Sequence, residues 1–258
     1  MILDKIVAQK KIDLEEFKKN NDLDKLKELA FKCPKKSSFK EALKKDGLSI
    51  IGELKKASPS KGVIVEYFRP MELLKEYEKI ADCVSVLTEE KFFLGSPEYL
   101  KEASEKTSLP LLRKDFIIDE IQIYEAKILG ASAILLICAI LSVEEMKEFL
   151  DLAKILDLDV LVESHNEEEL QKALQAGAEI VGINNRNLST FELTIDTTLN
   201  LLPLIPEGKI IVSESGFHTA EDIKKIKGTR VDAILVGESF MRTENIVEKA
   251  KEFRENFR

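Results

Sequence analysis

Charged and amide side chains end several short apolar runs of this sequence. Glu53 and Lys55 lie two positions apart at the end of the first run, and Lys114, Glu163 and Asn184 end or follow later runs. Buried charges are costly, so their repetition at the ends of apolar runs indicates a shared use rather than unrelated ion pairs. Ammonium and carboxylate groups that face one another can supply the acid and the base of a proton-transfer reaction.

Two glycines indicate an anion site next to these charges. Gly216 and Gly237 end the last two apolar runs, and Ser215 precedes the first of them. Glycine allows backbone N–H groups to approach and surround an anion, and a short helical turn over residues 238–242 would present its N-terminus to the same place. The pattern therefore predicts a phosphate-binding site.

The apolar runs themselves predict strands. They are short, rich in Ile, Val and Leu, and alternate with segments of helical spacing, which is typical of parallel strands buried on both faces. Ser142 with Glu145, and Asn166 with Glu169, mark the starts of two of the helices. The predicted strands are Leu48–Leu54, Cys83–Leu87, Leu109–Leu112, Ala133–Ile137, Val160–Val162, Ile180–Ile183, Ile210–Val212 and Ala233–Val236.

Regular alternation of strand and helix predicts an α/β protein with a parallel sheet. An open doubly wound sheet usually has a glycine-rich turn after its first strand, whereas residues 55–60 read KKASPS. We therefore expect a closed (β/α)8 TIM barrel, with its active site at the C-terminal ends of the strands. The whole chain, residues 1–258, is expected to be one domain, with a helical extension over 1–46 and the barrel over 47–258.

The few cysteines and histidines argue against a metal centre. Cys33, Cys83 and Cys138 are isolated from one another, so neither a disulfide framework nor a zinc site is expected. His165 and His218 are the only histidines, and neither has the neighbours of a metal site or a catalytic triad. We expect no metal and no cofactor.

Charge and hydropathy limit the partners and the compartment. The net charge is −8, from 47 carboxylates against 39 Lys and Arg, which argues against a nucleic-acid partner. The N-terminal segment is amphipathic and contains acidic residues, unlike a signal peptide. The longest apolar run, residues 131–141, is too short to cross a bilayer. We therefore expect a cytoplasmic protein with no membrane partner.

At this point the motifs resemble those of a known family. Residues 51–60, IGELKKASPS, are similar to the signature segment of the indole-3-glycerol phosphate synthase family. The match continues in order through residues 87–89, 114–116, 161–163, 182–188, 214–216 and 235–237. The resemblance implies closure of 1-(2-carboxyphenylamino)-1-deoxyribulose 5-phosphate to indole-3-glycerol phosphate, with loss of CO2 and water.

The resemblance also implies catalytic roles. Lys114 would be the general acid that protonates the carbonyl oxygen, and Glu163 would be the base. Glu53, Lys55 and Asn184 would orient these groups and assist dehydration. Because the arylamine nitrogen of the substrate can supply electrons itself, the reaction requires no cofactor.

The binding residues follow in the same way. Lys55, Gly216 and Gly237 match the phosphate site, Arg186 and Ser58 match the end of the site that holds the substrate carboxylate, and apolar residues match the wall of the ring pocket. Glu238 departs from the pattern, since several relatives have Ser or Thr there, and its side chain is expected to point away. The predicted substrate-binding residues are Ser58, Pro59, Phe93, Phe116, Leu135, Ile137, Arg186, Glu214, Ser215, Gly216, Leu235 and Gly237.

The same resemblance bears on the N-terminal extension and on assembly. Its helices, expected near 2–19, 22–31 and 38–44, would partly cover the barrel mouth, and residues 38–40 are expected to belong to that cap. From the residues alone, the extension could equally be an inert brace. The expected partner is a small phosphorylated substrate. The expected oligomeric state is a monomer or weak homodimer.

Two alternative functions remain open from the sequence. One is a Schiff-base aldolase with Lys55 or Lys114 as the nucleophile, although such a mechanism requires no Arg186. The other is a phosphate-binding barrel kept as a scaffold subunit. A scaffold would be expected to lose Lys114 or Glu163, and this chain retains both.

Overall fold

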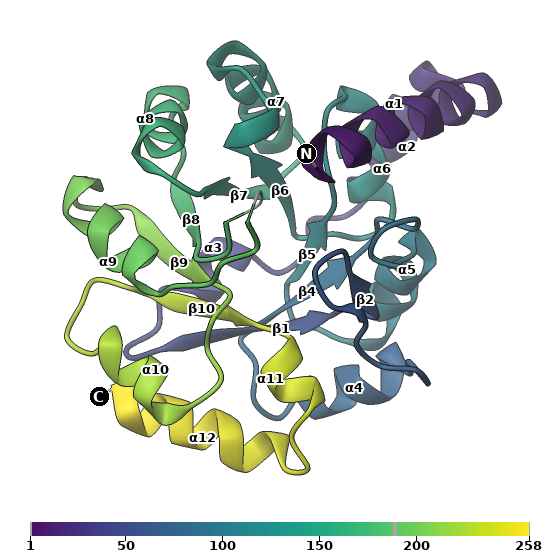
Figure 1. Ribbon diagram of the computed structural model, residues 1–258. Coiled ribbons are helices and arrows are strands. Elements are labelled where there is room, and N and C mark those ends of the chain that lie inside the picture. The colour runs from purple at the N-terminus through teal and green to yellow at the C-terminus, as the bar shows by residue number, and fades with distance from the viewer. Residues whose placement is uncertain (1, 188–189, 258) are drawn as a thin grey trace.

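The centre of the molecule is a closed barrel of parallel strands (Figure 1). The computed structural model describes residues 2–187 and 190–257, so Leu188 of the sequence motif lies outside the described residues. Neighbouring strands follow the order β1, β4, β5, β6, β7, β8, β9 and β10, and β10 pairs with β1. Closure confirms the predicted (β/α)8 barrel and excludes the open sheet. The strands are β1 Ser49–Leu54, β4 Cys83–Leu87, β5 Leu111–Lys114, β6 Ala133–Ile137, β7 Asp159–Ser164, β8 Ile180–Asn184, β9 Ile210–Glu214 and β10 Ala233–Val236.

The strand β5 begins and ends later than predicted. Pro110 has no backbone N–H, so the paired segment starts at Leu111 and extends to Lys114, which lies opposite Leu87 of β4. Lys114 is therefore part of the barrel wall rather than of the loop after it.

Because side chains alternate in direction along each strand, some charged side chains point into the barrel interior. Side chains two positions apart on a strand point to the same side. The interior core includes Ile51, Leu112, Leu161 and Val212, all almost completely buried. Two positions further along the same strands are Glu53, Lys114, Glu163 and Glu214. The apolar filling of the barrel thus gives way to a charged layer at the C-terminal mouth.

The helices surround the strands (Figure 1), and their starts follow local signals. Ser142 and Glu145 form the predicted capping box of α7. Within residues 2–187 and 190–257, no helix is long and apolar enough to span a membrane. The helices outside the extension are α4 Pro70–Tyr77, α5 Pro97–Lys106, α6 Glu120–Ile128, α7 Val143–Ile155, α8 Glu167–Ala176, α9 Asp196–Leu201, α10 Ala220–Lys225, α11 Glu238–Met241 and α12 Ile246–Phe257. Short 3-10 turns lie at Cys138–Ile140 and Leu202–Leu204, and an antiparallel hairpin, β2 Ala57–Ser58 with β3 Gly62–Val63, follows β1.

The N-terminal extension covers parts of both ends of the barrel. Helix α1, Ile2–Asn20, begins at the C-terminal mouth, where its first residues line the cavity described below. Helix α2, Leu23–Lys32, packs beside α6. The short helix α3, Phe39–Ala42, lies at the opposite end, under the barrel.

The expectation that residues 38–40 belong to the cap over the mouth is wrong. Phe39 and Leu43 are completely buried among the interior residues of the barrel. The Ser38 hydroxyl and the Lys40 backbone N–H both donate to Asp159, at the start of β7, over 2.9 Å. The N-terminal ends of the strands leave an apolar opening, and these two side chains fill it.

Candidate active site

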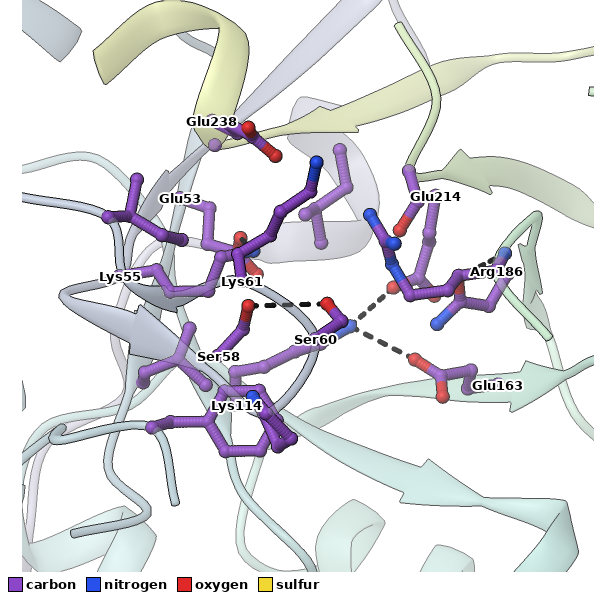
Figure 2. A pocket seen from close by; sticks show the side chains of 18 of the residues that line it. Glu53, Lys55, Ser58, Ser60, Lys61, Lys114, Glu163, Arg186, Glu214 and Glu238 are labelled. Atoms are coloured by element: carbon purple, nitrogen blue, oxygen red, sulfur yellow. Dashed lines mark hydrogen bonds and ion pairs between the residues drawn. The ribbon is translucent and has the colours of Figure 1, made fainter. Parts of the chain in front are cut away.

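One cavity at the C-terminal mouth is lined by all the site residues predicted from the sequence, and Figure 2 labels several of them. It has an empty volume of about 1230 Å³ and is partly open to solvent. Every barrel strand contributes a predicted residue from its end or from the segment that follows. The predicted residues that line it are Glu53, Lys55, Ser58, Pro59, Phe93, Lys114, Phe116, Leu135, Ile137, Glu163, Asn184, Arg186, Glu214, Ser215, Gly216, Leu235 and Gly237.

Lys114 lies between two carboxylates at the centre of the cavity. Its Nζ atom is 3.1 Å from Glu163 Oε2 and also donates to Glu214 Oε2. Figure 2 shows the ammonium reaching between these two side chains. The three residues come from β5, β7 and β9, which are alternate strands, and alternate strands contribute to one layer of a barrel interior.

The burial of these groups shifts their pKa values in different directions. Burial disfavours the ammonium of Lys114, but the carboxylates of Glu214, Glu163 and Glu53 outweigh it and raise the pKa of Lys114. Burial opposes the charge of Glu163, but Lys114, with additional help from His165, holds the pKa of Glu163 well below its usual range. Burial raises the pKa of Glu214 to about 7, because the attraction of Lys114 does not compensate for desolvation and for repulsion by Glu163.

A second ion pair lies on β1. Lys55 donates to Glu53 Oε2, as expected for residues two apart on one strand face. The buried Tyr77 hydroxyl donates to the backbone carbonyl of Glu53 over 2.9 Å and fixes this strand end. Gly237 leaves space for the carboxylate, since a Cβ atom there would lie 2.5 Å from Glu53 Oε2. Gly237 therefore has a steric role that the sequence did not reveal.

The turn after β9 shapes the glycine-lined end of the cavity. Ser215 and Gly216 both have positive φ, 69° and 96°, so the chain bends sharply there. The buried amide of Asn185 holds the turn by donating to Ser213 Oγ over 3.0 Å and to the Ser215 carbonyl over 2.9 Å. Sequence reasoning missed this role of Asn185, for which its place beside Asn184 at a strand end was the available signal.

The opposite side of the cavity is apolar. The rings of Phe93 and Phe116 lie 5.9 Å apart, and Leu135 and Ile137 point inward from β6. Helix α1 adds Ile2, Leu3 and Ile6, which sequence reasoning did not assign to the site. Residues 2 and 6 are apolar and one helical turn apart at the start of a charged helix, so their spacing was the available signal.

A buried ion pair attaches α1 to this mouth. Lys10 Nζ lies 2.7 Å from Asp115, whose carboxylate also contacts Arg113 and the Thr88 hydroxyl. Burial opposes the charge of Asp115, but Lys10 and Arg113 outweigh it and lower its pKa to about 2.

The remaining predicted residues lie at the rim. The Arg186 backbone N–H donates to Asn184 Oδ1 over 3.1 Å, and the Ser58 hydroxyl lies 3.4 Å from that of Ser60. Glu238 also lines the rim, but its carboxylate pairs with Arg242 at 3.1 Å. In the part of the chain that the structure describes, no group of three His, Cys, Asp or Glu residues is arranged to hold a metal ion.

These features define a (β/α)8-barrel enzyme in which a lysine ammonium, buried carboxylates and a glycine-containing turn line one cavity at the C-terminal mouth. The fold is shared with 3-hexulose-6-phosphate synthase from Salmonella typhimurium, with a TM-score of 0.65 at 15% identity over 81% of this chain and 98% of that one. A likeness at this identity speaks for the fold alone.

Sequence comparison gives the family. The model of the family described as indole-3-glycerol phosphate synthase matches residues 3–253. The indole-3-glycerol phosphate synthase of Endomicrobium trichonymphae is 50% identical over 258 residues, covering 99% of this chain and 100% of that protein. The protein of the same name from Nautilia profundicola is 51% identical over 251 residues, covering 95% of each. The chain belongs to the indole-3-glycerol phosphate synthase family, whose members are decarboxylating lyases of tryptophan biosynthesis.

Proposed function

We propose that the chain closes 1-(2-carboxyphenylamino)-1-deoxyribulose 5-phosphate to indole-3-glycerol phosphate, with Lys114 as general acid and Glu163 as general base. The observation that carries this proposal is the position of Lys114, 3.1 Å from Glu163, in a cavity with an apolar wall on one side and glycines on the other. The substrate has the matching parts, since an aromatic ring and a phosphate lie at its two ends.

The cavity orients the substrate along this axis. Backbone N–H groups of Gly216 and Gly237, with Lys55 nearby, bind the phosphate. The aromatic ring lies against Phe93 and Phe116, and Arg186 pairs with its carboxylate. The reacting ring carbon and the ribulose carbonyl are then held beside Lys114.

The charges of the site suit the successive proton transfers. Lys114, whose pKa is raised, carries the proton that it donates to the carbonyl oxygen as the ring carbon attacks. CO2 then leaves, and the new hydroxyl is lost as water. Glu163, whose pKa is lowered, is ionised and accepts the proton that the ring gives up. Glu53, Lys55 and Asn184 assist the loss of the hydroxyl.

The same charges argue against a Schiff-base aldolase. An amine must be neutral to attack a carbonyl, and the carboxylates around Lys114 stabilise its charged form. Borohydride added with substrate is expected to trap no adduct on Lys114 or Lys55. A reduced lysine adduct would favour the aldolase instead.

The direct experiment is incubation with the carboxyphenylamino substrate while indole fluorescence is recorded. Product should form with the wild-type chain and with Lys91→Met, a change outside the cavity, but hardly at all with Lys114→Ala. Failure of the folded wild-type chain to form product would refute the proposed function.

We also propose that the enzyme works in the cytoplasm as a monomer or weak homodimer. Cys33, Cys83 and Cys138 are free thiols, which suits a reducing compartment. Sedimentation at micromolar concentration should give the mass of one chain, and a stable dimer or larger assembly would contradict the proposed state.

A further inference from the structure

The two carboxylates that share Lys114 differ in their other partners. Glu163 has a cationic group near each oxygen: Lys114 Nζ lies 3.1 Å from Oε2, and His165 Nε2 lies 3.3 Å from Oε1, an ion-pair contact without hydrogen-bond geometry. Glu214 has Lys114 at Oε2, while its Oε1 is buried and accepts no hydrogen bond from the described residues. The pair is therefore electrostatically asymmetric.

His165 is held between two carboxylates. Its Nδ1 lies 2.9 Å from Glu169 Oε2, and its backbone N–H donates to the same oxygen over 2.9 Å. The Asn166 side-chain amide donates to the other oxygen of Glu169 over 2.9 Å. The side chain of His165 is only 8% exposed. Both ring nitrogens face carboxylates, and only the imidazolium carries a proton on each.

The electrostatics agree with this geometry. Burial disfavours the charged ring, but Glu163 and Glu169 outweigh it and raise the pKa of His165 to about 10. The ring is thus positively charged at neutral pH. It keeps that charge whether or not Lys114 has given a proton to the substrate.

One ammonium does not keep two adjacent buried carboxylates ionised, so the pair of Glu163 and Glu214 holds a shared proton near neutral pH. The other partners decide which carboxylate takes that proton. A second cation favours ionised Glu163, and an oxygen without a donor favours neutral Glu214.

We propose that His165, held in place by Glu169, is a positioning residue that directs the shared proton to Glu214 and so keeps Glu163 the ionised base. The inference rests on the proposed function, in which Glu163 accepts a proton. His165 does not line the substrate cavity but a neighbouring cavity formed by α1, α8 and the segment after β8. The other charged groups that face these residues or line that second cavity are Glu53, Lys55, Arg186, Asp4, Lys11, Glu168, Lys172 and Glu192.

The first test is the pH dependence of His165→Gln. Loss of a neighbouring cation raises a carboxylate pKa by about 1–3 units, so part of the shared proton moves to Glu163 and kcat should fall more near pH 7 than at higher pH. Above about pH 9 both carboxylates are ionised, and the loss should shrink to a few-fold. KM should change little, because His165 lies outside the substrate cavity. A loss of kcat that is equal at every pH would overturn the proposal.

The second test removes the competing carboxylate. In a Glu214→Gln background Lys114 faces only Glu163 of the two carboxylates, so no proton is shared and Glu163 stays ionised with or without His165; His165→Gln should therefore cost kcat much less than it does in the wild-type chain. Equal losses in the two backgrounds would contradict the proposed coupling.

The third test reads the charge directly and requires no turnover. NMR of the two histidines, assigned with His218→Gln, should show His165 titrating near pH 10 and Glu169→Gln lowering that value. Titration of His165 near 6.5, the ordinary value, would overturn the proposal. The NMR titration tests the charge of His165 and does not depend on the proposed function. The proposed function fails instead if the wild-type chain forms no indole product or if Glu163→Gln retains normal turnover.

Discussion

The ammonium nitrogen of Lys10, in α1, lies 2.7 Å from the carboxylate of Asp115, which directly follows Lys114 in the chain. Both side chains are largely buried, at 11% and 1% exposure. Since Ile2 and Ile6 of the same helix line the cavity, this pair joins the apolar wall to the strand that carries the proposed acid. The attachment of α1 and the shape of the site are therefore linked.

Lys10→Met should weaken substrate binding more than it slows chemistry. The change removes the attachment of α1 and leaves Asp115 with Arg113 and Thr88 as partners, so we expect KM to rise several-fold. The free energy of unfolding should fall by about 1–3 kcal/mol. Lys91→Met is the matched control, because Lys91 pairs with Asp13 of the same helix at 2.9 Å but is 54% exposed. Equal changes in KM for the two variants would mean that the buried pair has no particular role.

The same pair should contribute to acid stability. The pKa of Asp115 is about 2 in the folded chain, below the value of about 3.9 expected when unfolded. A lowered carboxyl pKa stabilises the fold above the unfolded value, by about 2 kcal/mol here, and this contribution is lost as the pH falls from about 4 through about 2. Denaturant unfolding at several pH values should show the difference between wild type and Lys10→Met shrinking over that window. A constant difference would contradict the assignment.

Removing the proposed acid or base should impair kcat with the fold intact. Loss of a proton-transfer group costs about a hundred- to ten-thousand-fold, so Lys114→Ala and Glu163→Gln should each fall in or beyond that range. Because both serve one reaction coordinate, the double variant should lose less than the product of the single losses. Near-normal turnover of either single variant, with an unchanged circular dichroism spectrum, would show that the residue is structural.

Gly237→Ala should disturb both the phosphate end and the ion pair on β1. The added Cβ atom would lie 2.5 Å from Glu53 Oε2, so the carboxylate must move away from its present contact with Lys55. We expect KM to rise and kcat to fall, each by about tenfold. Gly208→Ala is the control for lost stability, because its φ of +82° makes alanine strained there while a Cβ atom meets nothing within 4 Å. A similar kinetic effect at both glycines would argue against a local clash.

The sequence determined the barrel and the charged layer. Alternation along each strand places Glu53 two positions after Ile51 and Glu163 two positions after Leu161, so the same pattern that predicts a buried interior predicts charges at its end. Strand β5 was placed less accurately, because its extension to Lys114 depends on pairing with Leu87 of the neighbouring strand β4. The residues of the cavity were then identified from the family motifs. A short and specific motif can be recognised in a sequence without knowing how its residues pack in the fold.

Only the tertiary structure decided which groups touch. Lys114 meets Glu163 and Glu214 across 49 and 100 residues of chain, because barrel closure sets which strand ends face one another. The place of Phe39 at the far end of the barrel likewise depends on an opening that eight closed strands create. The contact of His165 with Glu163 is of the same kind. Local spacing hints at its bond to Glu169, four residues away, but strand packing alone turns the ring toward the proposed base.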